Sequence, residues 1–107
     1  MQRATEKVTT MMYKMYCYDG TGSQVSSEVC CDSKNKIITD LKALEKLAKD
    51  KAKALVNAAD EKMVTDPGVD YTLERICVNI VAQNADGSQS CVISYRGTKE
   101  WGTEKAQ

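Results

Sequence analysis

The sequence contains no histidine among its 107 residues. Histidine is the most frequent general base near neutral pH and the most frequent neutral metal ligand in proteins. The chain also lacks the C-x-x-C spacing of zinc and redox sites, a P-loop, a G-x-S-x-G elbow and an EF-hand loop. We therefore expect no enzymatic activity, no metal site and no cofactor.

Net charge and long apolar runs are absent as well. Fifteen Lys and Arg residues balance fifteen Asp and Glu residues, so the formal net charge is zero and implies no general attraction to nucleic acid or anionic membranes. No run of about 18 apolar residues could span a bilayer. The polar segment Met1–Lys7 lacks the apolar core of a secretory signal. We expect a cytoplasmic protein with no membrane span.

Proline and glycine are missing from the stretch Lys34–Met63, which is rich in Ala, Leu and Lys. These residues favour helix, so we predict one long helix here. Asp32 or Ser33 would cap its start, and Asp66-Pro67-Gly68 would end it. Steps of three and four place its apolar residues on one face: Ile37, Leu41, Leu44, Ala48, Ala52, Leu55, Ala59 and Met63.

Pairs of alternating segments flank this helix. Val8–Tyr18 and Ser23–Cys31 surround one glycine-containing turn, and Tyr71–Gln83 and Ser88–Arg96 surround another. The order β-β-α-β-β predicts an α+β fold, a four-stranded antiparallel sheet of two hairpins with the helix packed across one face. Either the first and third strands or the second and fourth are central. Residues 1–107 would form a single domain, with loose tails at 1–7 and 98–107.

Alternation along each strand assigns its side chains to two faces of the sheet. The more apolar set is expected to face the helix: Met11, Tyr13, Met15, Cys17, Val25, Val29, Cys31, Ile76, Val78, Ile80, Ala82, Cys91, Ile93 and Tyr95. A two-residue turn at Asp86-Gly87 predicts three apolar pairs in the second hairpin: Ala82 with Cys91, Ile80 with Ile93, and Val78 with Tyr95.

The five cysteines are an odd number and cannot all pair within one chain. Without an export signal we interpret them as reduced thiols. Cys17, Cys31 and Cys91 fall on the predicted core faces and act there as small hydrophobic side chains. Cys30 and Cys77 fall on the predicted outer face and are the candidates for a reactive thiol.

The sheet face away from the helix is the main candidate site. One helix covers only one side of a sheet, so this face has no cover from its own chain. Tyr, Met and Arg, which are enriched at protein interfaces, occur on it. The candidate partner-binding residues are Met12, Lys14, Tyr16, Tyr18, Arg75, Asn79, Val81, Val92 and Arg96. An ordinary half-solvated antiparallel face is the alternative interpretation.

These patterns favour a small non-catalytic protein-binding module that docks its open sheet face or a sheet edge onto another protein. A phage or mobile-element inhibitor that occupies a partner's surface fits the small size and the missing chemistry, by analogy alone. A homodimer is also expected. The predicted helix, roughly 40–45 Å long, overhangs strands of about 30 Å, and a second copy of the chain is the simplest cover.

Two other functions stay open. Single-stranded nucleic acid could bind the same face, with Lys14, Arg75 and Arg96 on phosphates and the tyrosines stacking on bases. Alternatively, the protein is a small-molecule binder or an enzyme with Cys30 or Cys77 as nucleophile. Without histidine, such a thiol would need Lys, Arg or a helix N-terminus to lower its pKa.

Overall fold

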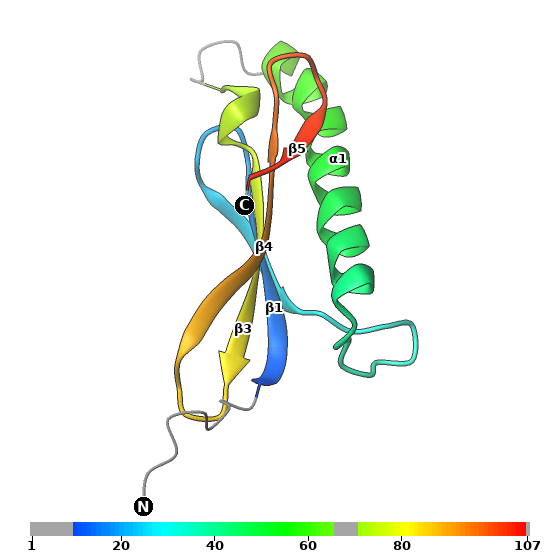
Figure 1. The fold of residues 1–107 in the computed structure, drawn as a ribbon. Helices are drawn as coiled ribbons and strands as arrows, with labels where there is room; N and C mark the ends of the chain where they lie inside the picture. The colour runs from blue at the N-terminus through cyan, green and yellow to red at the C-terminus, as the bar shows by residue number, and fades with distance from the viewer. Residues whose placement is uncertain (1–9, 66–70, 107) are drawn as a thin grey trace, which may run out of the picture.

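The computed structural model of the chain describes residues 10–65 and 71–106. Within them, five antiparallel strands form one sheet in the order β2-β1-β3-β4-β5, and helix α1 runs along one face (Figure 1). The elements are β1 (Thr10–Tyr18), β2 (Gln24–Val29), α1 (Leu41–Thr65), the 3₁₀ helix η1 (Leu73–Arg75), β3 (Cys77–Asn84), β4 (Gln89–Gly97) and β5 (Thr103–Lys105). The predicted α+β class and the antiparallel sheet are confirmed, with β1 beside β3.

The fifth strand was not expected, so the prediction of four strands is wrong by one. β5 pairs with the end of β4, where Arg96 lies opposite Glu104 and forms an ion pair with it at 2.6 Å. Lys105 reaches Glu45 of α1 at 3.0 Å. The predicted loose tail is therefore wrong for residues 103–105, while residues 1–7 lie outside the described residues. No helix in the described part of the chain is long and apolar enough to cross a membrane.

Helix α1 begins at Leu41 and not at Lys34, so the predicted start is wrong. Asp40 is its N-cap: the side-chain Oδ2 accepts a hydrogen bond from the backbone N–H of Ala43 at 3.2 Å. Its carbonyl oxygen accepts a bond from the N–H of Leu44 at 3.0 Å. A side-chain acceptor here satisfies one of the four backbone donors that a helix start leaves unpaired.

The segment before Asp40 is a loop, although its composition favours helix. The Oδ1 of Asp32 accepts hydrogen bonds from the backbone N–H groups of Lys34 and Lys36 at 2.8 and 3.0 Å. Asn35 has a φ of 65°, in the left-handed region that a right-handed helix excludes. The Asp32 side chain thus offers the backbone an alternative to helical hydrogen bonds, and the predicted cap becomes a loop residue.

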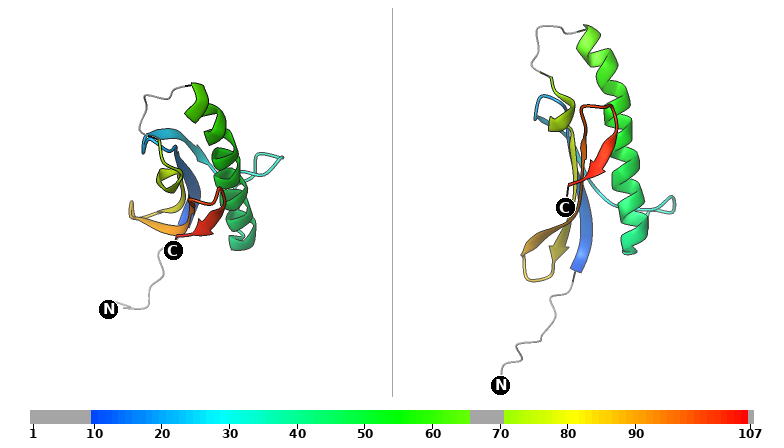
Figure 2. Two further views of the ribbon diagram at one scale, coloured as in Figure 1. Left: turned by 90° about the horizontal axis from the view of Figure 1, so that it is seen from above. Right: turned by 45° about the horizontal axis from the view of Figure 1, so that its top comes forward.

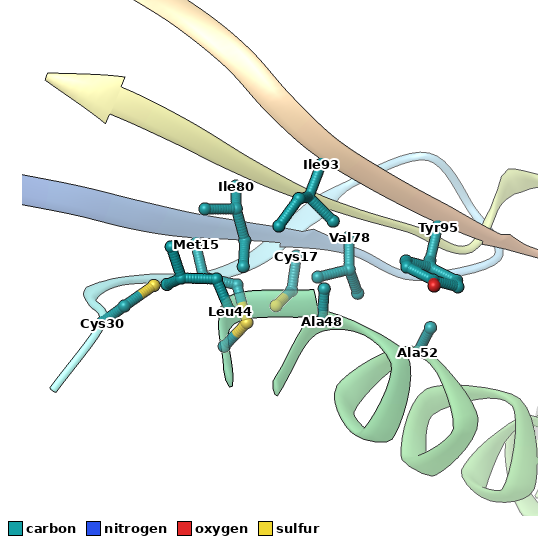
Figure 3. Close-up of a cluster of buried hydrophobic side chains, with 10 residues drawn as sticks. All are labelled: Met15, Cys17, Cys30, Leu44, Ala48, Ala52, Val78, Ile80, Ile93 and Tyr95. Carbon is teal, nitrogen blue, oxygen red and sulfur yellow. The ribbon is translucent and has the colours of Figure 1, made fainter. Parts of the chain in front are cut away.

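The core lies between α1 and strands β1, β3 and β4. Leu44, Ala48 and Ala52 point from the helix toward the sheet (Figure 3). Small alanines allow the helix backbone to approach the sheet closely. The sheet contributes Met15, Cys17, Val78, Ile80, Ile93 and Tyr95 to this cluster, and Val56, Ala59, Leu73 and Ile76 form a second one.

The predicted apolar face of the helix is confirmed only over its middle. Leu44, Ala48, Ala52 and Ala59 are buried, Leu55 is half-buried, and Val56 joins them unpredicted. Ile37 and Leu41 are exposed because they precede or only begin the helix. The side chain of Met63 lies outside the described residues.

In the second hairpin, the loop is one residue longer than predicted, and the strand pairing next to it is shifted by one residue. The N–H of Asn84 donates to the oxygen of Ser88, and Gly87 takes a φ of 88°, so the loop has three residues and not two. Pairing near the turn therefore shifts by one residue, and Ala82 faces Ser90. The predicted pair of Ala82 with Cys91 is wrong.

A β-bulge at Val92 cancels this shift. Beyond it, Ile80 pairs with Ile93 and Val78 with Tyr95, as predicted. The extra residue also changes the faces on either side of it. Cys91 pairs with Val81 and faces away from the helix, and Val92 lies on the helix side beside Ile93. The predicted positions of Cys91 in the core and of Val92 on the outer face are both wrong.

A second bulge occurs in β2, where Val25 has no partner on β1. Tyr18 pairs with Gln24 and Cys17 with Ser26. Val29 consequently lies opposite Lys14 on the outer face. The prediction that Val25, Val29 and Cys31 point into the core is therefore wrong: Val25 and Val29 are exposed and Cys31 is half-buried. Cys30, predicted outside, is buried.

The segment before β3 was predicted as strand from Tyr71, but strand pairing begins at Cys77. The N–H of Thr72 donates to the oxygen of Gly20 at 2.9 Å, and the Tyr71 ring occupies the space where a Cβ on Gly20 would lie. These contacts hold Tyr71 and Thr72 against the turn between β1 and β2.

Replacement of Asp40 by Ala should lower the free energy of unfolding by about 1 kcal/mol, because the N-cap bond is lost. Ser33→Ala removes one of the two helix caps predicted from the sequence. It should change the free energy of unfolding by less than about 0.5 kcal/mol. Urea unfolding followed by circular dichroism measures both. An equal loss in the two variants would contradict a helix start at Leu41.

Gly97→Ala should destabilise the fold by about 1–3 kcal/mol, as overpacking of a filled core does. A Cβ there would overlap the backbone oxygen of Leu73 and lie 3.2 Å from the Val56 side chain. In the control Gly102→Ala, the new Cβ meets only Thr98 Oγ1, at 3.4 Å. Differential scanning calorimetry should show a lower Tm for Gly97→Ala alone. Equal Tm values would rule out the close approach of η1 to β4.

Candidate protein-binding face

The sheet surface opposite α1, called the open face from here, is covered by no helix of the described residues (Figure 2). Strand pairing assigns its side chains, because directly opposed residues of neighbouring strands share a face. The open face includes Met12, Lys14, Tyr16 and Tyr18 of β1, Ser27 and Val29 of β2, Cys77, Asn79, Val81 and Gln83 of β3, and Cys91, Ser94 and Arg96 of β4.

Most of the predicted partner-binding residues are brought together here: Met12, Lys14, Tyr16, Tyr18, Asn79, Val81 and Arg96. Two are not. Val92 lies on the helix side because of the bulge, and Arg75 belongs to η1 and not to the sheet. Sequence reasoning missed Ser27, Val29 and Cys91 as members of the face, since only the bulges place them there. The position of Cys77 on the face agrees with the prediction.

A polar cluster occupies the centre of the open face. The Ser94 hydroxyl donates to the Oδ1 of Asn79 at 2.6 Å, and the Cys77 thiol donates to the same oxygen at 3.3 Å. Ser94 is only 7% exposed, so this hydrogen bond is shielded from water. The Asn79 oxygen is thereby fully used, and its orientation is fixed. The amide N–H groups of Asn79, which have no partner among the described residues, remain available as donors.

Lys14 lies beside this cluster, between Val29 of β2 and Val81 of β3. Its Nζ is 5.7 Å from the centroid of the Tyr16 ring, within the range of a cation–π contact. Lys14 has no ion pair with the described residues. Lys14 is thus an uncompensated positive charge with two valines and a tyrosine ring around it.

Arg96 is the second cation that the strands place on the open face, and its charge is compensated. Its Nη2 lies 2.6 Å from Glu104 Oε2, and its Nε donates to the same oxygen at 2.7 Å. Two charge-assisted contacts to one carboxylate oxygen hold the guanidinium against β5. Arg96 therefore lies at the edge of the open face, next to β5.

The thiols divide by burial. None of the five cysteines, all within the described residues, is in a disulfide. Burial raises the pKa of Cys30 to about 11 and also raises that of Cys17. Cys30 is therefore not the outer-face thiol expected from the sequence. Among the described residues, no group of three or more His, Cys, Asp and Glu side chains is arranged to hold a metal ion.

A scan of protein-family models found no match to this chain. Searches of curated proteins and of solved structures found no significant similarity.

Alkylation of the native protein by iodoacetamide at about pH 8 should modify the exposed Cys91 before the buried Cys17 and Cys30. Burial excludes the reagent and, by raising the pKa, keeps the inner thiols protonated. Raising the pH toward the Cys30 pKa of about 11 should increase its reactivity. A time course by peptide mass spectrometry measures each site, with protein unfolded in urea as the control. Rapid modification of native Cys30 would contradict its buried position.

Proposed function

We propose that this protein is a small non-catalytic binding module that docks its open face onto another protein. One observation carries the proposal: α1 covers one side of the sheet, and the other side gathers Tyr, Met, Val and Lys side chains around an oriented asparagine. Tyr and Met are enriched at protein interfaces, where an apolar surface surrounds a few directed polar groups. An inhibitor from a phage or mobile element is the finer form of this proposal.

The chemistry of the face supports one kind of partner surface. Val29 and Val81 would pack against apolar side chains, and Lys14 between them would meet a carboxylate. The Asn79 amide would donate to a backbone or side-chain oxygen. Because two donors hold its oxygen, the amide is oriented before binding, which reduces the entropy lost on association. The partner is thus a protein surface that is apolar with an acidic centre.

Single-stranded nucleic acid is a weaker candidate for the same face. Proteins that bind it follow the phosphate backbone with a row of cations, whereas Lys14 is the one uncompensated cation that the described strands place here and Arg96 is paired with Glu104. A cysteine enzyme is likewise weaker. Cys30 is buried and the pKa of its thiol is raised to about 11, and the Cys77 thiol donates a hydrogen bond to Asn79 Oδ1.

The double variant Lys14→Glu/Tyr16→Ala should lose its protein partner, because it reverses the central charge and removes the adjacent ring. The matched control is Lys53→Glu/Asn57→Ala, on the exposed side of α1. Affinity purification with mass spectrometry identifies the partner, and calorimetry with the purified partner measures Kd. We expect about a 30-fold weakening for the first variant, as for an interface hot spot, and no change for the control.

Partner binding that survives in the first variant would assign docking to another surface. Recovery of nucleic acid, with affinity that falls steeply as salt rises, would replace the proposal by the nucleic-acid function. Recovery of this chain alone would show a homo-oligomer that already uses the face. Circular dichroism of both variants establishes that the fold is intact.

A further inference from the structure

A second surface feature lies on the helix side of the sheet, apart from the open face. A groove of about 330 Å³ opens between the first turns of α1 and the bulged part of β4. Tyr13 and Ile93 contribute to its lining from the sheet, together with Leu41 from the helix and Val92 from the bulge. The volume is at the lower end of the roughly 300–1,000 Å³ typical of small-molecule sites.

Two features of the fold create this groove. The helix begins at Leu41, so no earlier turn covers this part of the sheet, and the bulge turns Val92 toward the helix side. Leu41 and Val92 consequently remain 56% and 37% exposed. Burying such apolar side chains against an apolar ligand is favourable.

The charges on the rim are unequal. Glu45 Oε2 lies 3.0 Å from Lys105 Nζ and accepts a hydrogen bond from the Tyr95 hydroxyl at 3.2 Å. Glu45 and Lys105 therefore compensate each other. Lys42, the third charged residue of the lining, has no ion pair with the described residues. An apolar groove with one uncompensated ammonium group is complementary to a ligand with an apolar body and one negative charge.

We propose that this groove binds a small amphiphilic carboxylate. Its apolar part lies against Leu41, Val92 and Ile93, and its carboxylate lies at Lys42. The volume limits the apolar part to about one aromatic ring with a short chain. This site lies on the face of the sheet opposite the open face and does not depend on the function proposed for that face.

A titration of the full chain with 4-phenylbutyrate, followed by ¹⁵N–¹H NMR, tests the proposal. We expect saturable shifts at the amides of Leu41, Lys42, Val92 and Ile93, with a Kd of roughly 1 mM for a ligand of this size. The amine analogue 4-phenylbutylamine has the same apolar body with the opposite charge. It should bind about twofold to fivefold more weakly, the effect of one exposed ion pair.

Lys42→Glu should weaken phenylbutyrate binding by about fivefold to tenfold, since it replaces attraction by repulsion. Lys53→Glu, further along α1, and the open-face variant Lys14→Glu/Tyr16→Ala should bind as the wild type does. The same spectra report whether each variant is folded. The open-face variant also separates this proposal from the first, because it should lose the protein partner and keep this ligand.

Any one of the following results would overturn the proposal: no saturable shift up to about 20 mM ligand, well above the Kd of a ligand of this size; equal binding of the amine; or unchanged affinity in Lys42→Glu. Shifts confined to Tyr16 and Asn79 would also overturn it, since they would place the ligand on the open face.

Discussion

One extra residue in each hairpin decides which side chains this protein buries and which it presents. The bulges at Val25 and Val92 shift strand pairing by one residue, and a shift of one residue exchanges the two faces of a strand. Val29 joins the open face for this reason, and Val92 lines the groove under α1. Both candidate binding surfaces therefore depend on the hydrogen-bonding register of the sheet.

The helix supports the same division of the surface. Ala48 and Ala52 are fully buried against the sheet, and their small size brings α1 close to one face. A single helix held in this way leaves the opposite face to the strands alone. Because the helix starts only at Leu41, it also leaves part of the helix side of the sheet uncovered. The groove lies there, beside Val92 of β4. One face thus presents a broad surface, and the other presents a small concave site.

Ion pairs around β5 determine where uncompensated charge remains. Arg96 pairs with Glu104, and Lys105 pairs with Glu45. These exposed pairs each contribute little to stability, but they neutralise cations at the margins of both surfaces. Lys14 on the open face and Lys42 at the groove are left without ion pairs among the described residues. A protein with zero formal net charge can in this way offer an anion a specific position on each side of its sheet.

The sequence by itself determined the α+β class, the antiparallel hairpins, the middle of the helix and most of the open face, including Tyr16 and Asn79. Periodicities of 2 and 3.6 residues are local properties and can be read from a single segment. Tertiary structure decided the two bulges and β5. The later helix start has a local cause, because the Asp32 carboxylate accepts hydrogen bonds from the backbone N–H groups of Lys34 and Lys36. Bulges and short edge strands exist only through pairing with distant residues. The faces of Cys30, Cys91 and Val92 could not be predicted for that reason.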